Sequence, residues 1–104
     1  MFRLELGNSN VLVVGLGRSG MAACRFLREH GSRVAASDAQ SEQQLGSVIA
    51  ELKASGVTIR AGESRPGAAG FDLLVISPGV PSDAPVVLQA RELGVPVIGE
   101  LELA

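Results

Sequence analysis

A glycine-rich hexapeptide, GLGRSG at residues 15–20, is the segment of this sequence best suited to bind a ligand. It has the spacing G-x-G-x-x-G and directly follows the apolar run VLVV. In such a loop, Gly15 permits a tight turn, Gly17 lets a phosphate approach the backbone, and Gly20 lets the next helix pack closely on the strand. The free N–H groups at the start of that helix then face the anion. The segment predicts a phosphate-binding loop; the alternative is that the glycines serve only the turn.

A carboxylate and a turn motif follow two other apolar runs. Asp38 lies 18 residues after Gly20, about where a dinucleotide fold places the acid that accepts a hydrogen bond from a ribose hydroxyl. Its alternative role is in a loop or a helix cap. Residues 77–81, SPGVP, follow the run DLLVI. There Gly79 can take a positive φ and turn its N–H toward a ligand, although the same residues would also suit a plain strand-to-helix turn.

The remaining reactive residue types do not favour a metal site or a nucleophile. His30 is the only histidine and has no cysteine near it in the sequence, so we expect no metal site. Cys24 lies inside an expected helix, where a packing role is favoured over a nucleophilic one. The sequence lacks the motif G-x-x-x-x-G-K-[ST], and Lys53, its only lysine, lies within a helical pattern. We therefore expect no ATP binding through a P-loop.

Five short apolar runs predict buried β-strands, and helical patterns lie between most of them. The expected strands are residues 11–14, 33–37, 57–61, 72–76 and 95–98. The expected helices are residues 19–30, 41–55 and 83–93. Gly31, Gly56 and Gly94 stand directly after helical patterns, where a left-handed residue commonly ends a helix.

Two further positions predict where helices begin. Ser41 is the expected cap of the second helix, with Gln44 at the third position of a capping box. Ser82 or Asp83 is the expected cap of the last helix, and Pro85 is tolerated in its first turn.

These elements predict an α/β fold. Strands that alternate with helices pair in parallel through right-handed crossovers, which gives a Rossmann-like, doubly wound, five-stranded parallel sheet. A length of 104 residues suits a single domain. Residues 62–71, rich in Gly, Pro and Ala, predict a loop with at most one helical turn. We expect the domain to cover residues 1–98, and residues 99–104 to begin a linker or helix toward a further domain.

Composition excludes several classes of partner. The net charge is −2 and aromatic residues make up 3% of the chain, so no basic, base-stacking surface for nucleic acid is expected. No apolar run approaches the roughly 20 residues that span a bilayer, and we expect no membrane association. A single cysteine forms no internal disulfide, which fits a reducing compartment, so a cytoplasmic protein is expected.

The segments GLGRSG, SDAQ and SPGVP, in this order, resemble the N-terminal domain of the Mur ligases, above all its D-glutamate-adding members. The resemblance spans the whole chain and extends to the final segment LGVPVIGELELA. It implies a three-domain cytoplasmic enzyme of peptidoglycan synthesis, whose N-terminal domain binds the UDP end of UDP-N-acetylmuramoyl-L-alanine. A central P-loop domain would bind ATP and Mg²⁺, and a C-terminal domain would bring in D-glutamate. None of those catalytic parts lies in this sequence, so the chain is expected to bind the substrate, hold no cofactor and not catalyse.

The resemblance also implies which residues bind the UDP substrate. The positions are Gly15, Gly17, Arg18, Ser19, Gly20, Asp38, Ala39, Ser77 and Gly79. Gly17, Arg18 and Ser19 would surround the uracil and the diphosphate. Asp38 would contact the uracil–ribose end, and Ala39 would flank the base.

The turn at residues 77–81 completes the implied site, and two other parts of the site depart from the family pattern. Gly79 would offer its backbone near the pyrophosphate or the ribose. The family often has an apolar residue where this chain has Arg18, and Thr-Arg where it has Ala39-Gln40. The planar guanidinium of Arg18 could still stack on uracil.

Two other functions stay open on the residues alone. One is the NAD(P)-binding domain of an oxidoreductase, and the other is a regulatory nucleotide-sensing module. A dinucleotide domain normally has a second half of three further strands, whereas only two short ones are expected here. The segments SPGVP and GELEL favour the Mur ligase interpretation over both.

Overall fold

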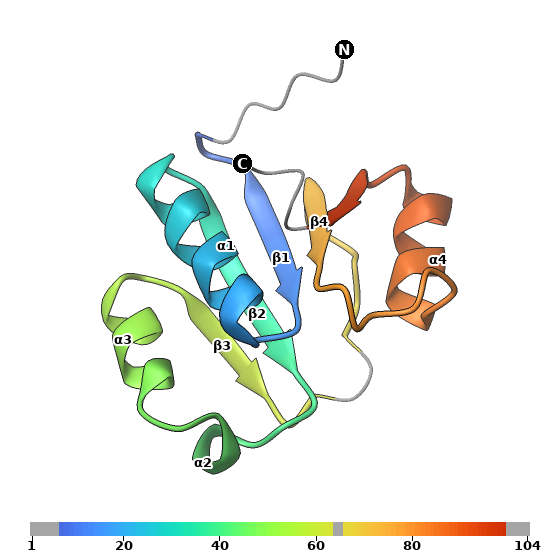
Figure 1. Ribbon diagram of the computed structural model, residues 1–104. Coiled ribbons are helices and arrows are strands. Elements are labelled where there is room, and N and C mark those ends of the chain that lie inside the picture. The colour runs from blue at the N-terminus through green and yellow to red at the C-terminus, as the bar shows by residue number, and fades with distance from the viewer. Residues whose placement is uncertain (1–6, 64–65, 100–104) are drawn as a thin grey trace.

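The described residues form one parallel sheet with helices on both faces (Figure 1). The computed structural model describes residues 7–63 and 66–99. The elements are β1 (Asn10–Val14), α1 (Arg18–Glu29), β2 (Arg33–Asp38), α2 (Glu42–Leu45), α3 (Val48–Ala54), β3 (Thr58–Ala61), β4 (Leu73–Ile76), α4 (Pro85–Leu93) and β5 (Val97–Gly99). All strand pairs are parallel, in the order β3-β2-β1-β4-β5. The predicted α/β fold with a doubly wound, five-stranded sheet is confirmed.

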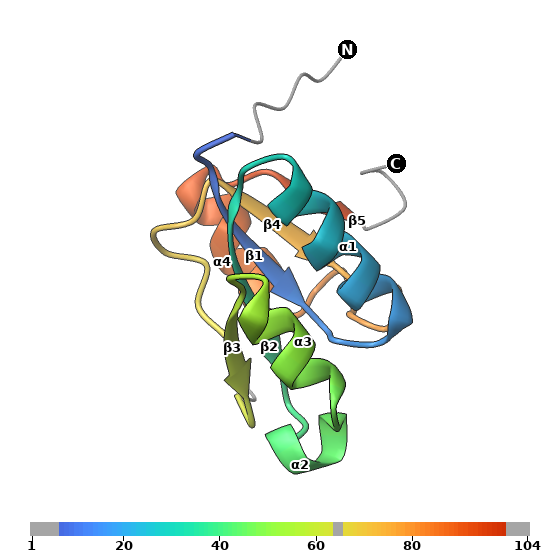
Figure 2. The ribbon, with the colours of Figure 1, turned by 90° about the vertical axis from the view of Figure 1, so that its left-hand side faces the viewer.

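The strands are apolar on both faces because both faces are covered. Val11 and Val13 of β1 are buried on the face covered by α1 and α3. Leu12, between them, is buried on the opposite face against α4. Figure 2 shows the two helical layers on either side of the sheet. Burial of each such side chain stabilises the fold by about 1.5–3 kcal/mol. Because successive side chains point to opposite faces, both helical layers are packed against the same strand.

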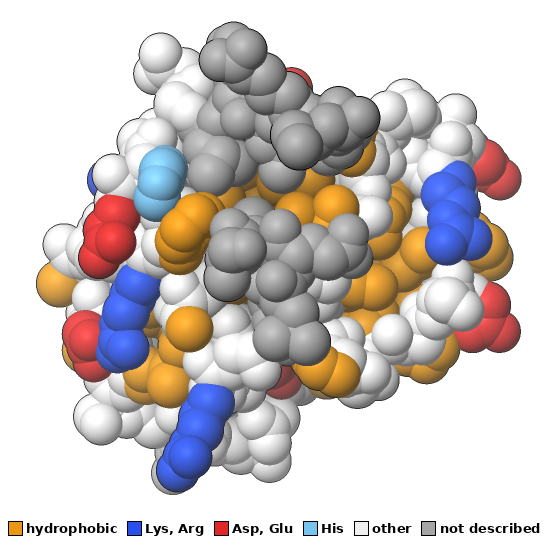
Figure 3. All heavy atoms as spheres, turned by 45° about the horizontal axis from the view of Figure 1, so that its top comes forward, with side chains coloured by type: hydrophobic (Ala, Val, Ile, Leu, Met, Phe, Trp, Pro, Cys, Tyr) orange, Lys and Arg blue, Asp and Glu red, His pale blue; other side chains and the backbone are white. Residues whose placement is uncertain are grey.

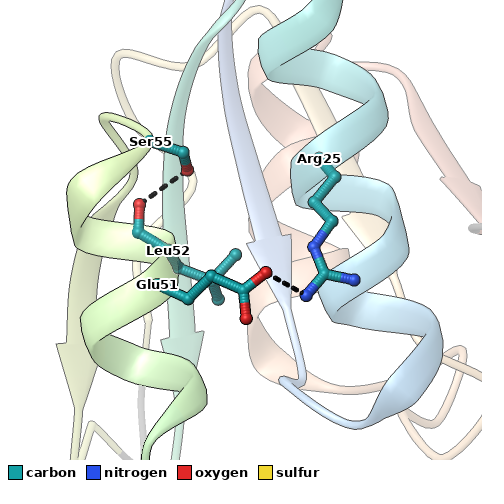
Figure 4. Close-up of polar contacts among 4 residues, drawn as sticks. All are labelled: Arg25, Glu51, Leu52 and Ser55. Atoms are coloured by element: carbon teal, nitrogen blue, oxygen red, sulfur yellow. Dashed lines mark hydrogen bonds and ion pairs between the residues drawn. The ribbon is translucent and has the colours of Figure 1, made fainter.

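Helices α1 and α3 lie side by side on one face of the sheet, with an exposed ion pair between them. Arg25 Nη2 of α1 donates to Glu51 Oε1 of α3, and the hydroxyl of Ser55, which directly follows α3, donates to the Leu52 carbonyl oxygen (Figure 4). The side chains of Arg25 and Glu51 are 47% and 61% exposed. An exposed pair is worth about 0–1 kcal/mol, so burial rather than this pair holds the two helices together.

The prediction of one continuous helix over residues 41–55 is wrong. The chain forms α2 and α3 instead, with a break at Gly46, whose φ is +80°. A positive φ is incompatible with a right-handed helix, so the backbone stops and restarts there. The predicted cap is confirmed: Gln44 N–H donates to Ser41 Oγ at 3.2 Å, and Ser41 N–H donates to Gln44 Oε1 at 2.9 Å.

The last helix begins later than expected. Its cap is Ala84, without a side-chain hydrogen bond, so the prediction of Ser82 or Asp83 as cap is wrong. Pro85 occupies the first turn, as predicted, where its missing N–H costs nothing and its fixed φ starts the helix. The left-handed residue that ends this helix is Gly94, with φ +76°, and that prediction is confirmed.

No helix lies between β3 and β4 in the described part of the connecting loop, as the Gly-, Pro- and Ala-rich composition predicts. The loop is anchored to α4 instead, because Ala68 N–H donates to Gln89 Oε1 at 2.8 Å and Ala68 is fully buried. Within residues 7–63 and 66–99 there is no helix long and apolar enough to cross a membrane. The predicted linker or helix over residues 99–104 lies almost entirely outside the described residues.

Candidate functional site

The strand order places the candidate site at the carboxyl ends of β1 and β4. From β1 the chain runs outward to β2 and β3, then returns to the other side of β1 as β4. In parallel α/β sheets the crevice at such a reversal, outside the carboxyl ends of the strands, is where ligands bind. The glycine loop follows β1 and the turn at residues 77–80 follows β4, at the lower edge of the sheet in Figure 1.

Backbone hydrogen bonds join the three strand ends at this edge. Gly15 N–H donates to the Ser37 carbonyl oxygen at 2.8 Å, which links the end of β1 to the end of β2. Ser77 N–H donates to the Val14 carbonyl oxygen at 3.1 Å, which links β4 to β1. The three segments singled out in the sequence therefore meet in one place.

Two glycines of the loop are required by close contacts and the third is open. A Cβ on Gly15, whose φ is +98°, would lie 2.4 Å from Ser77 Oγ, and a Cβ on Gly20 would lie 1.9 Å from the Gly15 carbonyl oxygen. These contacts confirm the predicted tight turn at Gly15 and the close helix–strand approach at Gly20. A Cβ on Gly17 would meet nothing within 4 Å. The loop is thus tightly packed at both ends and exposed in the middle.

The start of α1 leaves hydrogen-bond donors exposed beside Gly17. Gly17 precedes the helix without a side-chain cap, and the first turn contains no acidic residue. Helix geometry leaves the first N–H groups without an intrahelical partner and gives this end a partial positive charge. Arg18 and Ser19 are exposed and belong to this first turn. The combination suits an anionic group.

Asp38 holds the glycine loop in place. Its Oδ2 accepts from Leu16 N–H at 2.7 Å, and its Oδ1 accepts from Gln40 N–H at 2.8 Å. The first bond ties the end of β2 to the loop after β1, and the second closes a local turn. Asp38 therefore has the role in a loop that was the alternative to ligand binding. A contact between Asp38 and a ribose stays a prediction.

The SPGVP segment forms a simple turn. Val80 N–H donates to the Ser77 carbonyl oxygen at 3.0 Å, so Pro78 and Gly79 occupy the two central positions. The positive φ considered for Gly79 is not found. A turn with proline at its second position can close with negative φ at both central residues, so no left-handed residue is needed. Gly79 is exposed, and a Cβ there would meet nothing within 4 Å.

Two neighbouring cavities open at this edge. One, of about 200 Å³, is lined by Gly15, Asp38 and Ala39 among others, and the second, of about 210 Å³, is lined by Gly79. The two share the lining residues Val14, Pro66 and Val80. The other predicted positions line neither cavity; they are Gly17, Arg18, Ser19, Gly20 and Ser77. The structure thus places the predicted nucleoside contacts in the cavities and the exposed part of the glycine loop at the surface.

Glu63 also lines the cavity beside the glycine loop, and the sequence patterns did not predict it. Glu63 lies just after β3, and its Oε1 accepts a hydrogen bond from the hydroxyl of the buried Ser37 at 2.9 Å. It lines the same cavity as Asp38. The available signal was weak: Glu63 is the first acidic residue after the third strand, within a loop whose composition indicated only irregular structure.

Cys24 takes no part in this site, and the described residues provide no metal centre. Cys24 is fully buried in α1, and burial raises the pKa of its thiol to about 12, which confirms a packing role. Within the two described ranges, no three His, Cys, Asp or Glu side chains are grouped closely enough to hold a metal ion.

Similarity to known proteins agrees with this geometry. A family model described as "Mur ligase MurD-like, N-terminal domain" matches residues 9–99. The chain is 48% identical over 104 residues to UDP-N-acetylmuramoylalanine--D-glutamate ligase of Koribacter versatilis, and 50% identical over 102 residues to the ligase of the same name of Myxococcus xanthus. Each alignment covers 97% of this chain and 22% of the relative, so the chain spans about a fifth of the length of these relatives.

Solved structures show the same fold. The crystal structure of UDP-N-acetylmuramate-alanine ligase from Thermotoga maritima aligns with a TM-score of 0.68 and 26% identity, over 91% of this chain and 21% of that one. The precorrin-2 dehydrogenase SirC aligns with a TM-score of 0.61 at 19% identity, over 93% of this chain and 47% of that one, and shows the fold alone. With a family model matched over nearly its whole length, the chain belongs to the MurD-like N-terminal domain family of the Mur ligases.

Proposed function

We propose that this chain is the UDP-binding domain of a ligase that adds D-glutamate to UDP-N-acetylmuramoyl-L-alanine in peptidoglycan synthesis. Family membership supports the reaction class. One structural observation supports the binding role: the exposed start of α1, with Gly17 open beside it, lies next to the cavities where three strand ends meet. Residues 1–98 would form this domain, and the central and C-terminal domains of the same enzyme would be its partners.

The diphosphate is assigned to the glycine loop and the first turn of α1. There the N–H groups of Arg18 and Ser19 and the partial positive charge of the helix end would stabilise the anion. The open space at Gly17 lets phosphate oxygens reach these N–H groups. The exposed guanidinium of Arg18 would add a charged contact to the phosphate or stack on the base.

The nucleoside is assigned to the cavity beside the glycine loop. Ala39 lines this cavity and is small enough to leave room for a flat base. Gly79 lines the adjoining cavity with no side chain in the way. Ser77 contributes through its position, because its Oγ packs against Gly15 and holds the two loops together.

The chemical step is assigned to the rest of the enzyme. ATP with Mg²⁺ would phosphorylate the substrate carboxylate, and D-glutamate would attack the resulting acyl phosphate. We infer that ATP and Mg²⁺ bind in the rest of the enzyme, because this sequence lacks a P-loop motif. The chain would therefore bind and not catalyse, and the whole enzyme would work in the cytoplasm.

Thermal denaturation of this chain with UDP-N-acetylmuramoyl-L-alanine, UDP, NAD and NADPH in parallel tests the proposal. A ligand at 100 times its Kd adds about 2.7 kcal/mol of stability, a shift of several degrees in Tm. We expect shifts with the two uridine ligands only. A shift with NAD or NADPH alone would favour the dinucleotide-binding alternative, and a shift with neither group would leave the nucleotide-sensing alternative to be tested with other nucleotides.

A further inference from the structure

The two carboxylates that line the cavity beside the glycine loop are bonded differently. Both oxygens of Asp38 accept from backbone N–H groups, those of Leu16 and Gln40. Glu63 uses only Oε1, which accepts from the Ser37 hydroxyl. Its Oε2 has no partner among the residues that the structure describes. A carboxylate oxygen can accept about two hydrogen bonds, so Glu63 keeps more accepting capacity than Asp38.

Glu63 is held at the cavity from two sides. Its own N–H donates to the Asp38 carbonyl oxygen at 3.0 Å, and the N–H of the preceding Gly62 donates to the Gln40 carbonyl oxygen at 2.7 Å. Ser37, which grips the carboxylate, is 1% exposed and belongs to the sheet. Backbone and side chain are thus both anchored to the end of β2, which orients the carboxylate before a ligand arrives.

Charge divides the site into two ends. Glu63 and Asp38 supply acceptors at the cavity, whereas the first turn of α1 supplies N–H donors and Arg18 without any acidic residue. A nucleoside diphosphate has the matching polarity, because its phosphates are anionic and its ribose hydroxyls donate hydrogen bonds. A diphosphate near the carboxylates would be repelled. The ribose therefore belongs at the carboxylate end and the phosphates at the helix end.

We propose that Glu63 accepts a hydrogen bond from a ribose hydroxyl of the bound uridine nucleotide, and that Ser37 is the residue that positions its carboxylate. This inference rests on the proposed function. It moves to Glu63 the role that the sequence suggested for Asp38, whose carboxylate is engaged with the backbone. The chain would consequently prefer UDP to 2′,3′-dideoxyuridine diphosphate.

Isothermal titration of both nucleotides into the wild-type chain and four variants tests this. A hydrogen bond to a charged group is worth roughly a factor of 10 in affinity, so wild type should bind UDP about 10-fold more tightly than the dideoxy nucleotide. Glu63→Ala should lose that preference by weakening UDP alone. Glu63→Gln, with the same shape and no charge, and Ser37→Ala should each lose roughly half of it on a logarithmic scale. Glu29→Ala, an exposed carboxylate at the far end of α1, is the matched control and should match wild type.

The outcomes separate the two proposals. If wild type binds UDP but Glu63→Gln keeps the full preference for UDP, the role of Glu63 is overturned and the proposed function stands. Equal weakening of both nucleotides in Glu63→Ala also overturns it, because Glu63 would then act on the base or on the loop. If the wild-type chain binds neither nucleotide, the proposed function fails and this inference fails with it.

Discussion

The two edges of the sheet both carry cavities and charged groups, but their hydrogen bonds are distributed differently. The amino edge opens into the larger cavity, of about 380 Å³, lined by Arg28 and Arg33. Figure 3 looks toward this edge and shows hydrophobic side chains lying between charged ones. The carboxyl edge has the two smaller cavities beside the glycine loop. Cavity volume alone would favour the amino edge over the carboxyl edge.

The arginines of the amino edge are already engaged with the chain itself. Arg28 donates to the carbonyl oxygens of Ser55 and Ser32, just after the ends of α3 and α1. Arg33 donates to the Asn8 carbonyl oxygen and to Asn10 Oδ1. Helix C-terminal ends carry partial negative charge, so an anion gains little there. At the carboxyl edge the start of α1 has no side-chain cap and no acidic residue in its first turn, and this difference favours the carboxyl edge as the proposed binding edge.

The largest expected loss of stability comes from Gly20, where α1 packs against the backbone that follows β1. In Gly20→Ala, the new Cβ overlaps the Gly15 carbonyl oxygen, so the backbone must shift and the free energy of unfolding should fall by about 3 kcal/mol or more. Thermal denaturation should show a Tm lower by roughly 10 °C or more. Gly17→Ala is the matched change: its Cβ meets nothing, so stability should change by less than about 1 kcal/mol while UDP binding weakens. Similar Tm values for the two variants would contradict this contrast.

Removal of an arginine at the amino edge should lower the free energy of unfolding and leave UDP affinity unchanged. Arg28→Ala removes two hydrogen bonds from a charged donor, those to the Ser55 and Ser32 carbonyl oxygens, at a cost of about 1–3 kcal/mol in the free energy of unfolding. Urea denaturation measures this, and UDP affinity should stay the same. Arg18→Ala at the other edge should do the reverse, weakening UDP without lowering the urea midpoint. Loss of UDP binding in Arg28→Ala would erase the distinction between the edges.

A smaller loss of stability is expected when the carboxylate that ties β2 to the glycine loop is neutralised. Asp38→Asn keeps the size, but only one side-chain atom can then accept, so either Leu16 N–H or Gln40 N–H loses its partner. The free energy of unfolding should fall by about 1–2 kcal/mol in urea titrations. An unchanged urea midpoint would show that Asp38 does not hold the loop.

The smallest effect concerns Cys24, which lies between the two edges inside α1. Burial raises the pKa of its thiol from 9.0 to about 12, so above pH 9 the unfolded chain loses this proton before the folded chain does. Stability from this group is full below pH 9 and falls as the pH rises toward 12, by at most about 1.4 kcal/mol per pH unit. Urea titrations from pH 8 to 10 should show a flatter decline in Cys24→Ala than in wild type. Equal slopes would mean that the thiol is accessible in the fold.

Much of this fold could be predicted because local chemistry specifies it. Short apolar runs between helical patterns indicated strands. Gly94 indicated the end of a helix, because glycine adopts the left-handed conformation without a steric cost. The break at Gly46 was missed because a glycine inside a helical pattern costs only about 1 kcal/mol, which does not decide between a break and a continuous helix. The cap of α4 was missed for a similar reason, since Ser82, Asp83 and Pro85 offered competing starts.

The sequence by itself determined the alternation of strands and helices, the glycine loop and the edge of the sheet at which a ligand should bind. Those features depend on residues close together in the chain or on rules common to parallel sheets. Only the tertiary structure decided the partners of Asp38 and the approach of Glu63 to Ser37, which join residues 22 and 26 positions apart. Such contacts depend on strand order and register, which bring side chains from separate strand ends together, and no local pattern encodes which oxygen remains available for a ligand.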